Sequence, residues 1–173
     1  MPDEMEWRRF FSVVEDAVRS PRRVTSKLLL VGPVEVPGIA AADALDANDA
    51  LGTEFKVRVP RWGTIVNAFY HDLDDEGTAV ELWIFRHTFT DAASDAAFSL
   101  VDIDNLFVAG VFLFDRFADA ANNQIGLTKD TPLWYVAPEG YLYCQVKTTS
   151  TPTIAAAQSP QVSFIIDSSD PDF

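Results

Sequence analysis

The hydrophobic positions of this chain change their period at Pro21. Before this proline, apolar side chains recur with the 3.6-residue period of an amphipathic helix. They are Trp7, Phe10, Phe11, Val14 and Val18. After it, apolar and polar residues alternate with a period near two, which is typical of strands. The pattern predicts an N-terminal helical arm at residues 1–26 and a β-sandwich domain at residues 27–173.

The predicted helix has recognisable signals at both ends. Asp3 and Glu6 have the spacing of a capping box, and Pro21 disfavours helical geometry at Ser20. Two interpretations of its apolar stripe remain open: the helix packs on its own domain, or it is an arm that docks on a neighbouring subunit. In the second case the subunit-contact candidates are Trp7, Phe10, Phe11, Val14, Arg22 and Arg23.

About eight segments after Pro21 have the composition and alternation of strands. They are residues 27–31, 53–59, 63–71, 78–86, 107–115, 132–136, 141–147 and 161–167. Few helical patterns separate them, which favours an all-β antiparallel sandwich or barrel over parallel βαβ units. The polar run Asp72–Gly77 predicts that the third and fourth segments form a hairpin. The longer connections at 38–51 and 88–105 are of the kind that is functional or covers a sheet edge.

The charge is strongly acidic and unevenly distributed. The chain has 26 acids and 13 bases, a net charge of -13, and residues 1–27 contain six bases and five acids, so the remainder has a net charge of -14. An acidic body repels nucleic acid, so we expect no direct nucleic-acid binding. We also expect no membrane association and no secretory signal, since no apolar run approaches the roughly 20 residues of a spanning helix.

Candidate reactive groups are few, and each has an ordinary structural explanation. The Asp72–Gly77 run resembles the start of a calcium loop, but Trp83 occupies the position of the bidentate Glu, so a solvated hairpin tip is expected. In that hairpin His71 and His87 would lie about 30 Å apart, too far to share a metal ion. Cys144 is the single cysteine, and its apolar neighbours at i±2 place it in the core. We predict no enzyme activity, no metal and no cofactor.

Two tyrosines differ from the other aromatic residues, most of which should fill the space between two sheets. Tyr141 and Tyr143 alternate with Leu142 and Cys144, so both are predicted to face outward. An outward aromatic pair can form a subunit contact or a platform on which a sugar stacks.

A series of short sequence features resembles one group of proteins. The features are Ala47–Thr53 before Phe55, Gly63–Ile65, the Asp72–Gly77 turn, Leu82–Phe85, Asp95–Phe98, Asp102–Leu106, Gly140–Tyr143, the segment 148–153 and a last Val/Phe/Ile strand. Their order, over about residues 40–167, resembles small structural proteins of tailed bacteriophages, some of which are jelly-roll decoration or cement proteins. Residues 1–26 lie outside this resemblance.

The resemblance implies a jelly-roll-like sandwich in a virion that assembles in the host cytoplasm. It also implies a homo-oligomer, as a trimer or ring, bound to the major capsid protein or to other virion proteins. No catalytic residue transfers from the group. An alternative expectation is a carbohydrate-binding or receptor-binding module of a fibre or tail, with Tyr141 and Tyr143 as its contact residues.

Overall fold

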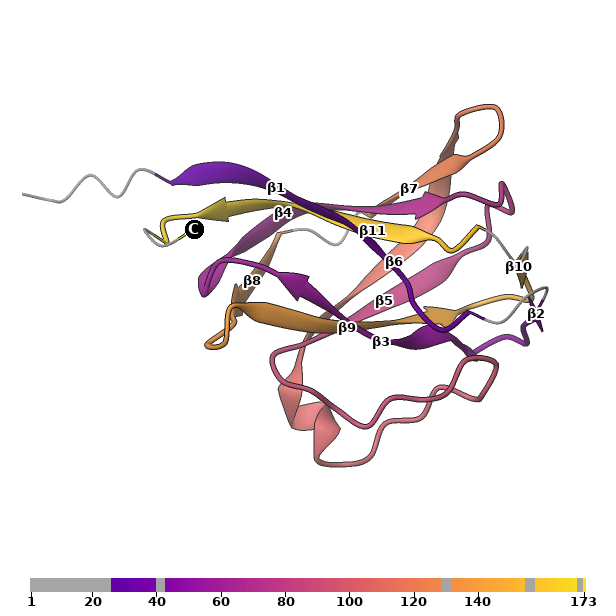
Figure 1. Cartoon of the computed structure of the whole chain (residues 1–173), viewed down its shortest axis with the longest axis horizontal. Helices are drawn as coiled ribbons and strands as arrows, with labels where there is room; N and C mark the ends of the chain where they lie inside the picture. The colour runs from indigo at the N-terminus through magenta and orange to yellow at the C-terminus, as the bar shows by residue number, and fades with distance from the viewer. Residues whose placement is uncertain (1–25, 40–42, 129–131, 155–157, 171–172) are drawn as a thin grey trace, which may run out of the picture.

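The computed structural model describes residues 26–39, 43–128, 132–154, 158–170 and 173 (Figure 1). These residues form strands and one short 3-10 helix. The elements are β1 (Lys27–Glu35), β2 (Asp43–Ala44), β3 (Ala50–Arg58), β4 (Trp62–Asp72), β5 (Val80–Phe85), η1 (Asp104–Phe107), β6 (Val108–Asp119), β7 (Gln124–Thr128), β8 (Leu133–Val136), β9 (Tyr141–Thr148), β10 (Thr153–Ile154) and β11 (Gln161–Ser168).

The all-β antiparallel prediction is confirmed, since every ladder between these strands is antiparallel. Each of the eight predicted segments overlaps an observed strand. The sequence pattern missed β7 and the two-residue strands β2 and β10. The predicted helix falls almost wholly on residues 1–25, which lie outside the described part of the chain.

One curled sheet contains all the longer strands, in the order β1-β11-β4-β7-β6-β5-β9-β3, and β8 pairs with β4 beside β7. Figure 1 shows the sheet bent into two layers, with β1, β11, β4 and β7 above β3, β9 and β5. The two ends of the sheet approach each other just after β1, where the Thr53 N–H donates to the Pro37 carbonyl at 2.9 Å.

The strand pairs are nested along the chain. The innermost pair is β5 with β6, followed by β4 with β7 and β8, then β3 with β9, and finally β1 with β11. The first and last long strands are therefore neighbours, as in a long hairpin that has been rolled up. This nesting brings the beginning and the end of the described body to the same edge of the upper layer.

The predicted hairpin between β4 and β5 is wrong. Strand β4 pairs with β11, β7 and β8, whereas β5 pairs with β6 and β9, so the Asp72–Gly77 turn passes from one layer to the other. Asp72 is 3% exposed, and its carboxylate accepts the Asp74 N–H at 3.1 Å and the Gly77 N–H at 2.8 Å. The Asp72 carboxylate accepts backbone N–H groups of the turn, so the turn does not need a ladder between β4 and β5. The two strands can therefore separate, and each buries its apolar side in its own layer.

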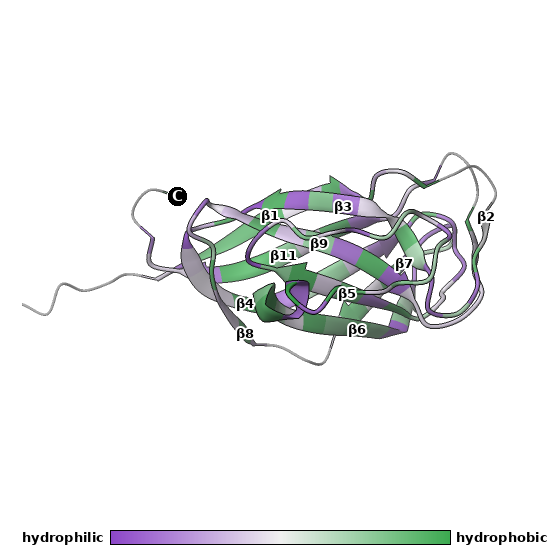
Figure 2. Cartoon of the chain, turned by 90° about the horizontal axis from the view of Figure 1, so that it is seen from below, coloured by the Kyte–Doolittle hydropathy of each residue, from purple (hydrophilic) through white to green (hydrophobic). Residues whose placement is uncertain are grey.

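The main core lies between the layers and contains every second side chain of the central strands. Figure 2 shows this alternation of hydrophobic and hydrophilic residues. Its largest fully buried members include Phe112, Phe114, Phe164, Leu82 and Ile166. Burying a side chain of this size stabilises the fold by roughly 1.5–3 kcal/mol, so the phenylalanines are a major source of its stability.

A second apolar cluster lies outside the sandwich. The long connection between β5 and β6, residues 86–107, packs against the outer surface of the lower layer, as Figure 1 shows. Phe89 of this connection stacks on Phe85 with ring centroids 3.8 Å apart, and Tyr143 completes the buried cluster. The connection therefore covers a sheet face rather than the sheet edge considered from the sequence. On the outer side of β5 and β9, Phe85, Tyr143 and Gln145 are consequently buried.

Candidate functional site

Six of the predicted contact residues lie outside the part of the chain that the structure describes. They are Trp7, Phe10, Phe11, Val14, Arg22 and Arg23. The remaining two, Tyr141 and Tyr143, both belong to β9, but their environments differ. Tyr141 is 38% exposed, whereas Tyr143 is 5% exposed.

Tyr143 lies on the outer side of its sheet, as its alternation with Leu142 predicts, but it does not face solvent. The 86–107 connection covers it, and its hydroxyl donates to Glu139 Oε2 at 2.6 Å. The Lys56 ammonium lies 5.5 Å from the ring centroid. The hydrogen bond to Glu139, together with burial, raises the pKa of Tyr143 to about 12. The expected outward pair of tyrosines is therefore wrong for Tyr143, because a distant loop covers it.

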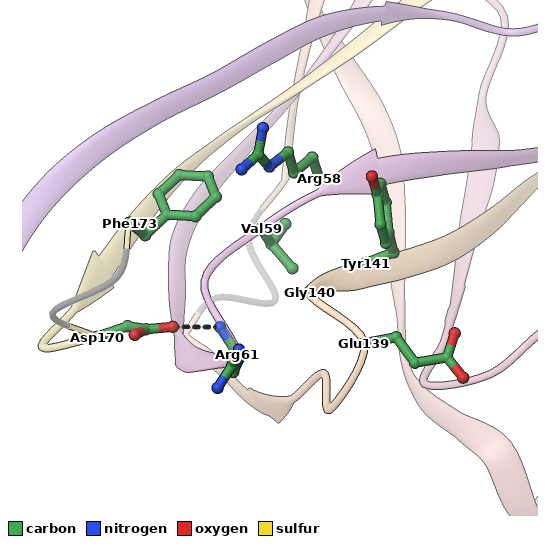
Figure 3. A pocket seen from close by; sticks show the side chains of 8 residues that line it. All are labelled: Arg58, Val59, Arg61, Glu139, Gly140, Tyr141, Asp170 and Phe173. Atoms are coloured by element: carbon green, nitrogen blue, oxygen red, sulfur yellow. Dashed lines mark hydrogen bonds between the residues drawn. The ribbon is translucent and has the colours of Figure 1, made fainter.

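Tyr141 instead lines a small open cavity of about 260 Å³ at one end of the sandwich (Figure 3). Three distant segments of the chain form its wall. The lining residues are Arg58, Val59, Arg61, Glu139, Gly140, Tyr141, Asp170 and Phe173. The volume lies below the roughly 300–1,000 Å³ of drug-sized ligand pockets, so the cavity suits one small polar group.

Charges of both signs surround this cavity. The guanidinium of Arg58 lies 5.8 Å from the centroid of the Phe173 ring. The buried carboxylate of Asp170 accepts the Arg61 backbone N–H at 2.7 Å, which fixes the turn between β3 and β4. Two arginines and two carboxylates balance formally, so the cavity does not select strongly for an anion or a cation. Its recognition elements are the Arg58 guanidinium and the exposed edge of Tyr141.

The other groups singled out from the sequence have structural roles. Cys144 is fully buried, as predicted, and burial raises the pKa of its thiol. His71 Nε2 hydrogen-bonds with Ser163 Oγ at 2.8 Å, and burial lowers the pKa of this imidazole. In the part of the chain that the structure describes, no three His, Cys, Asp or Glu side chains are grouped so that they could bind a metal ion. Within the same ranges, no helix is long and apolar enough to span a bilayer.

Sequence analysis did not identify one group of exposed apolar side chains. It lies on the outer side of the upper layer and is here named the outer apolar face. Its members are Leu28, Leu30, Phe69, Leu127, Trp134 and Ile165. Leu28, Leu30 and Trp134 are 71%, 72% and 66% exposed. Large exposed apolar side chains gathered on one side of a sheet are typical of surfaces that bind another protein segment.

Strand register places these side chains in three rows across one side of the sheet, with the polar residues Asp167 and Thr64 between Leu28 and Trp134. One row across the sheet contains Leu28, Asp167, Thr64 and Trp134, each paired with the next. A second row pairs Leu30 with Ile165, and a third pairs Phe69 with Leu127. Adjacent strands lie about 4.8 Å apart, so the first row is about 14 Å wide. Leu28, Leu30 and Trp134 lie in strands whose sequences are apolar on both sides, so only the tertiary structure shows that they are exposed and joins them into one face.

No family model, no curated protein and no solved structure matches this chain. The cavity at Tyr141 and the outer apolar face are therefore the basis on which a function can be proposed.

Proposed function

We propose that this chain is a structural protein of a tailed-bacteriophage particle, specifically a capsid decoration or cement protein. Its partners would be the major capsid protein or other virion proteins, and copies would assemble as a trimer or ring in the host cytoplasm. The N-terminal segment and the outer surfaces of the sandwich would make the contacts between subunits.

The observation that supports this proposal best is the exposure of large apolar side chains on the outer surfaces of the body. Leu28, Leu30 and Trp134 are exposed on one layer, and the 86–107 connection, which packs on the other layer, exposes Val101, Ile103 and Leu106. A protein that functions alone in water gains nothing from such a surface, but a repeated part of a shell buries it against a neighbour.

The strand arrangement supports the jelly-roll assignment within this proposal. The single curled sheet has the order β1-β11-β4-β7-β6-β5-β9-β3, with β8 paired to β4, and its strand pairs are nested along the chain. The jelly roll, which viral capsid domains and lectins share, has eight strands in two sheets, and this order would fit it if the curl divides the sheet between β7 and β6. Fold alone does not specify a function, so this point supports the proposal without deciding it.

Two measurements test the proposal. Mass spectrometry of purified particles should detect this chain at a fixed ratio to the major capsid protein. Deletion of residues 1–23 should leave a soluble, folded body that no longer joins the particle. Absence of the chain from washed particles would contradict the proposal, and normal incorporation of the deletion variant would contradict the role of the N-terminal segment.

The cavity at Tyr141 supports a second candidate, a carbohydrate-binding or receptor-binding module of a fibre or tail. An exposed tyrosine beside an arginine can stack on a sugar ring and donate hydrogen bonds to its hydroxyl groups. Binding on a glycan array that is lost in both Tyr141→Ala and Arg58→Ala would favour this function. Glu76→Ala, at an exposed site in the Asp72–Gly77 turn, is the matched control and should leave any binding unchanged.

A further inference from the structure

We propose that the outer apolar face binds the apolar stripe of residues 7–18 from a second copy of this chain. This inference rests on the proposed assembly role, and it names both the receiving surface and its occupant. It connects two features that the sequence places far apart, the stripe before Pro21 and the outward side chains of five strands.

The two surfaces match in chemistry. The stripe presents two phenylalanines, a tryptophan and two valines on one side of a predicted helix. The face presents Leu28 and Leu30 from β1 and Trp134 from β8, each more than 60% exposed. Burying both surfaces together removes apolar area from water on each side, which is the dominant favourable contribution to protein association.

The stripe is also long enough to cover the face. As a helix, Trp7 to Val18 would span eleven steps of about 1.5 Å, which is about 17 Å. The first and third rows of the face are separated by the four steps of β11 from Asp167 to Ser163, about 13 Å at roughly 3.3 Å per step, and β4 has one extra residue there because its register with β11 shifts. A helix lying along β4 would therefore place its stripe over all three rows.

The length of the connecting segment allows the stripe to bind a second copy. Residues 19–27 contain four bases and no acid, and like charges extend a linker. If extended, the eight residues 19–26 would reach about 26 Å, far enough to carry the stripe beyond the edge strand β1 to a neighbouring molecule. Because every copy supplies one stripe and one face, exchange between copies satisfies all of them in a closed ring or trimer.

Site-directed disulfides test the proposal directly in the full-length chain. A Phe11→Cys variant is mixed with a separate Leu30→Cys variant and oxidised; Cys144 is fully buried and does not compete. We expect a covalent dimer between the two variants, and in a chain that has both substitutions we expect bonds between chains. Leu106→Cys replaces Leu30→Cys in the control, because Leu106 is 74% exposed on η1, away from the face.

Two results would overturn the proposal. A disulfide within single chains of the double variant would show that the segment covers its own body. Equal trapping with Leu30→Cys and Leu106→Cys would show that the stripe does not recognise the face.

A second measurement avoids cross-linking. Sedimentation of the Leu30→Asp variant should show self-association weakened at least tenfold, while Leu106→Asp, a control of nearly equal exposure, associates as the unmodified chain does. Equal association of the two variants, or an unmodified chain that stays monomeric at every concentration, would overturn the proposal.

The outcome is distinguishable from failure of the proposed function. If cross-linking fails but the chain is present in purified particles, the virion role stands and only this interface is wrong. If the stripe binds the face but the chain is absent from particles, the interface stands and the virion role is wrong.

Discussion

Gln145 of β9 holds Ala92 of the 86–107 connection through both backbone groups. The Gln145 Nε2 donates to the Ala92 carbonyl at 2.6 Å, and its Oε1 accepts the Ala92 N–H at 3.3 Å. The same Nε2 also donates to the Gly52 carbonyl at 3.0 Å. A single buried amide thus joins the connection to two strands, which explains how a loop without regular structure can cover a sheet face.

Replacing Gln145 with Leu should therefore destabilise the fold and release the connection. Each buried backbone group left without a partner costs roughly 1–3 kcal/mol, so we expect a loss of at least about 2 kcal/mol in chemical denaturation. Limited proteolysis should cut first within residues 86–107. Gln161→Leu, at the half-buried start of β11, is the control and should change stability far less. Equal effects of the two substitutions would contradict this role for Gln145.

The tyrosines should make stability fall at alkaline pH. The pKa of Tyr143 is raised to about 12 by its hydrogen bond to Glu139 and by burial, and burial also raises the pKa of Tyr70 and Tyr135. The folded state thus favours the neutral phenol. The contribution of these tyrosines to the free energy of unfolding is complete below pH 10 and is lost as the pH rises toward 12. Unfolding by urea, followed between pH 8 and pH 12, measures it.

The Tyr143→Phe variant separates this tyrosine from the others. It should lose roughly 0.5–1.5 kcal/mol at neutral pH, because one hydrogen bond to Glu139 is removed. Its stability should also fall less steeply between pH 10 and pH 12. An unchanged pH dependence in this variant would show that Tyr143 does not contribute to alkaline unfolding.

Cys144 should be unreactive until the protein unfolds. It is fully buried, and because burial raises the pKa of the thiol, the reactive thiolate is scarce. A thiol reagent at pH 8 should modify it at the rate of global unfolding, whereas an engineered Leu106→Cys, at a site that is 74% exposed, should react at once. Rapid labelling of the native protein at Cys144 would contradict the described core.

Asp72 should be important for the crossing between layers. Its carboxylate accepts two backbone N–H groups of the turn, so Asp72→Ala should cost about 2 kcal/mol or more in thermal or chemical unfolding. Glu76→Ala, at an exposed site in the same turn, should change stability by less than about 0.5 kcal/mol. Similar effects of the two substitutions would mean that the turn does not depend on the Asp72 carboxylate.

Strand positions could be predicted from the sequence because their signals are local. Alternation from Thr53 to Val59 and from Val162 to Ile166 places apolar side chains on one side of a strand, and this requires no knowledge of partners. The same alternation located Cys144 in the core. The missed strand β7 is five residues long and has Gly126 at its centre, so its period is too weak to detect.

The candidate sites depended on contacts between distant residues. Tyr143 has the sequence pattern of an outward side chain, but the 86–107 connection buries it. The cavity at Tyr141 joins residues 58–61, 139–141 and 170–173, and the outer apolar face joins β1, β11, β4, β7 and β8. The residues that form each of these sites come from separate parts of the chain.

The sequence by itself determined that this protein is a body of antiparallel strands with an apolar interior, since period-two patterning follows from local backbone geometry. Only the tertiary structure decided which strands are neighbours, and it placed β4 and β5 in different layers despite the turn that joins them. The physical reason is that partner choice and register minimise the exposed apolar area of the whole sheet, a quantity that no single segment contains.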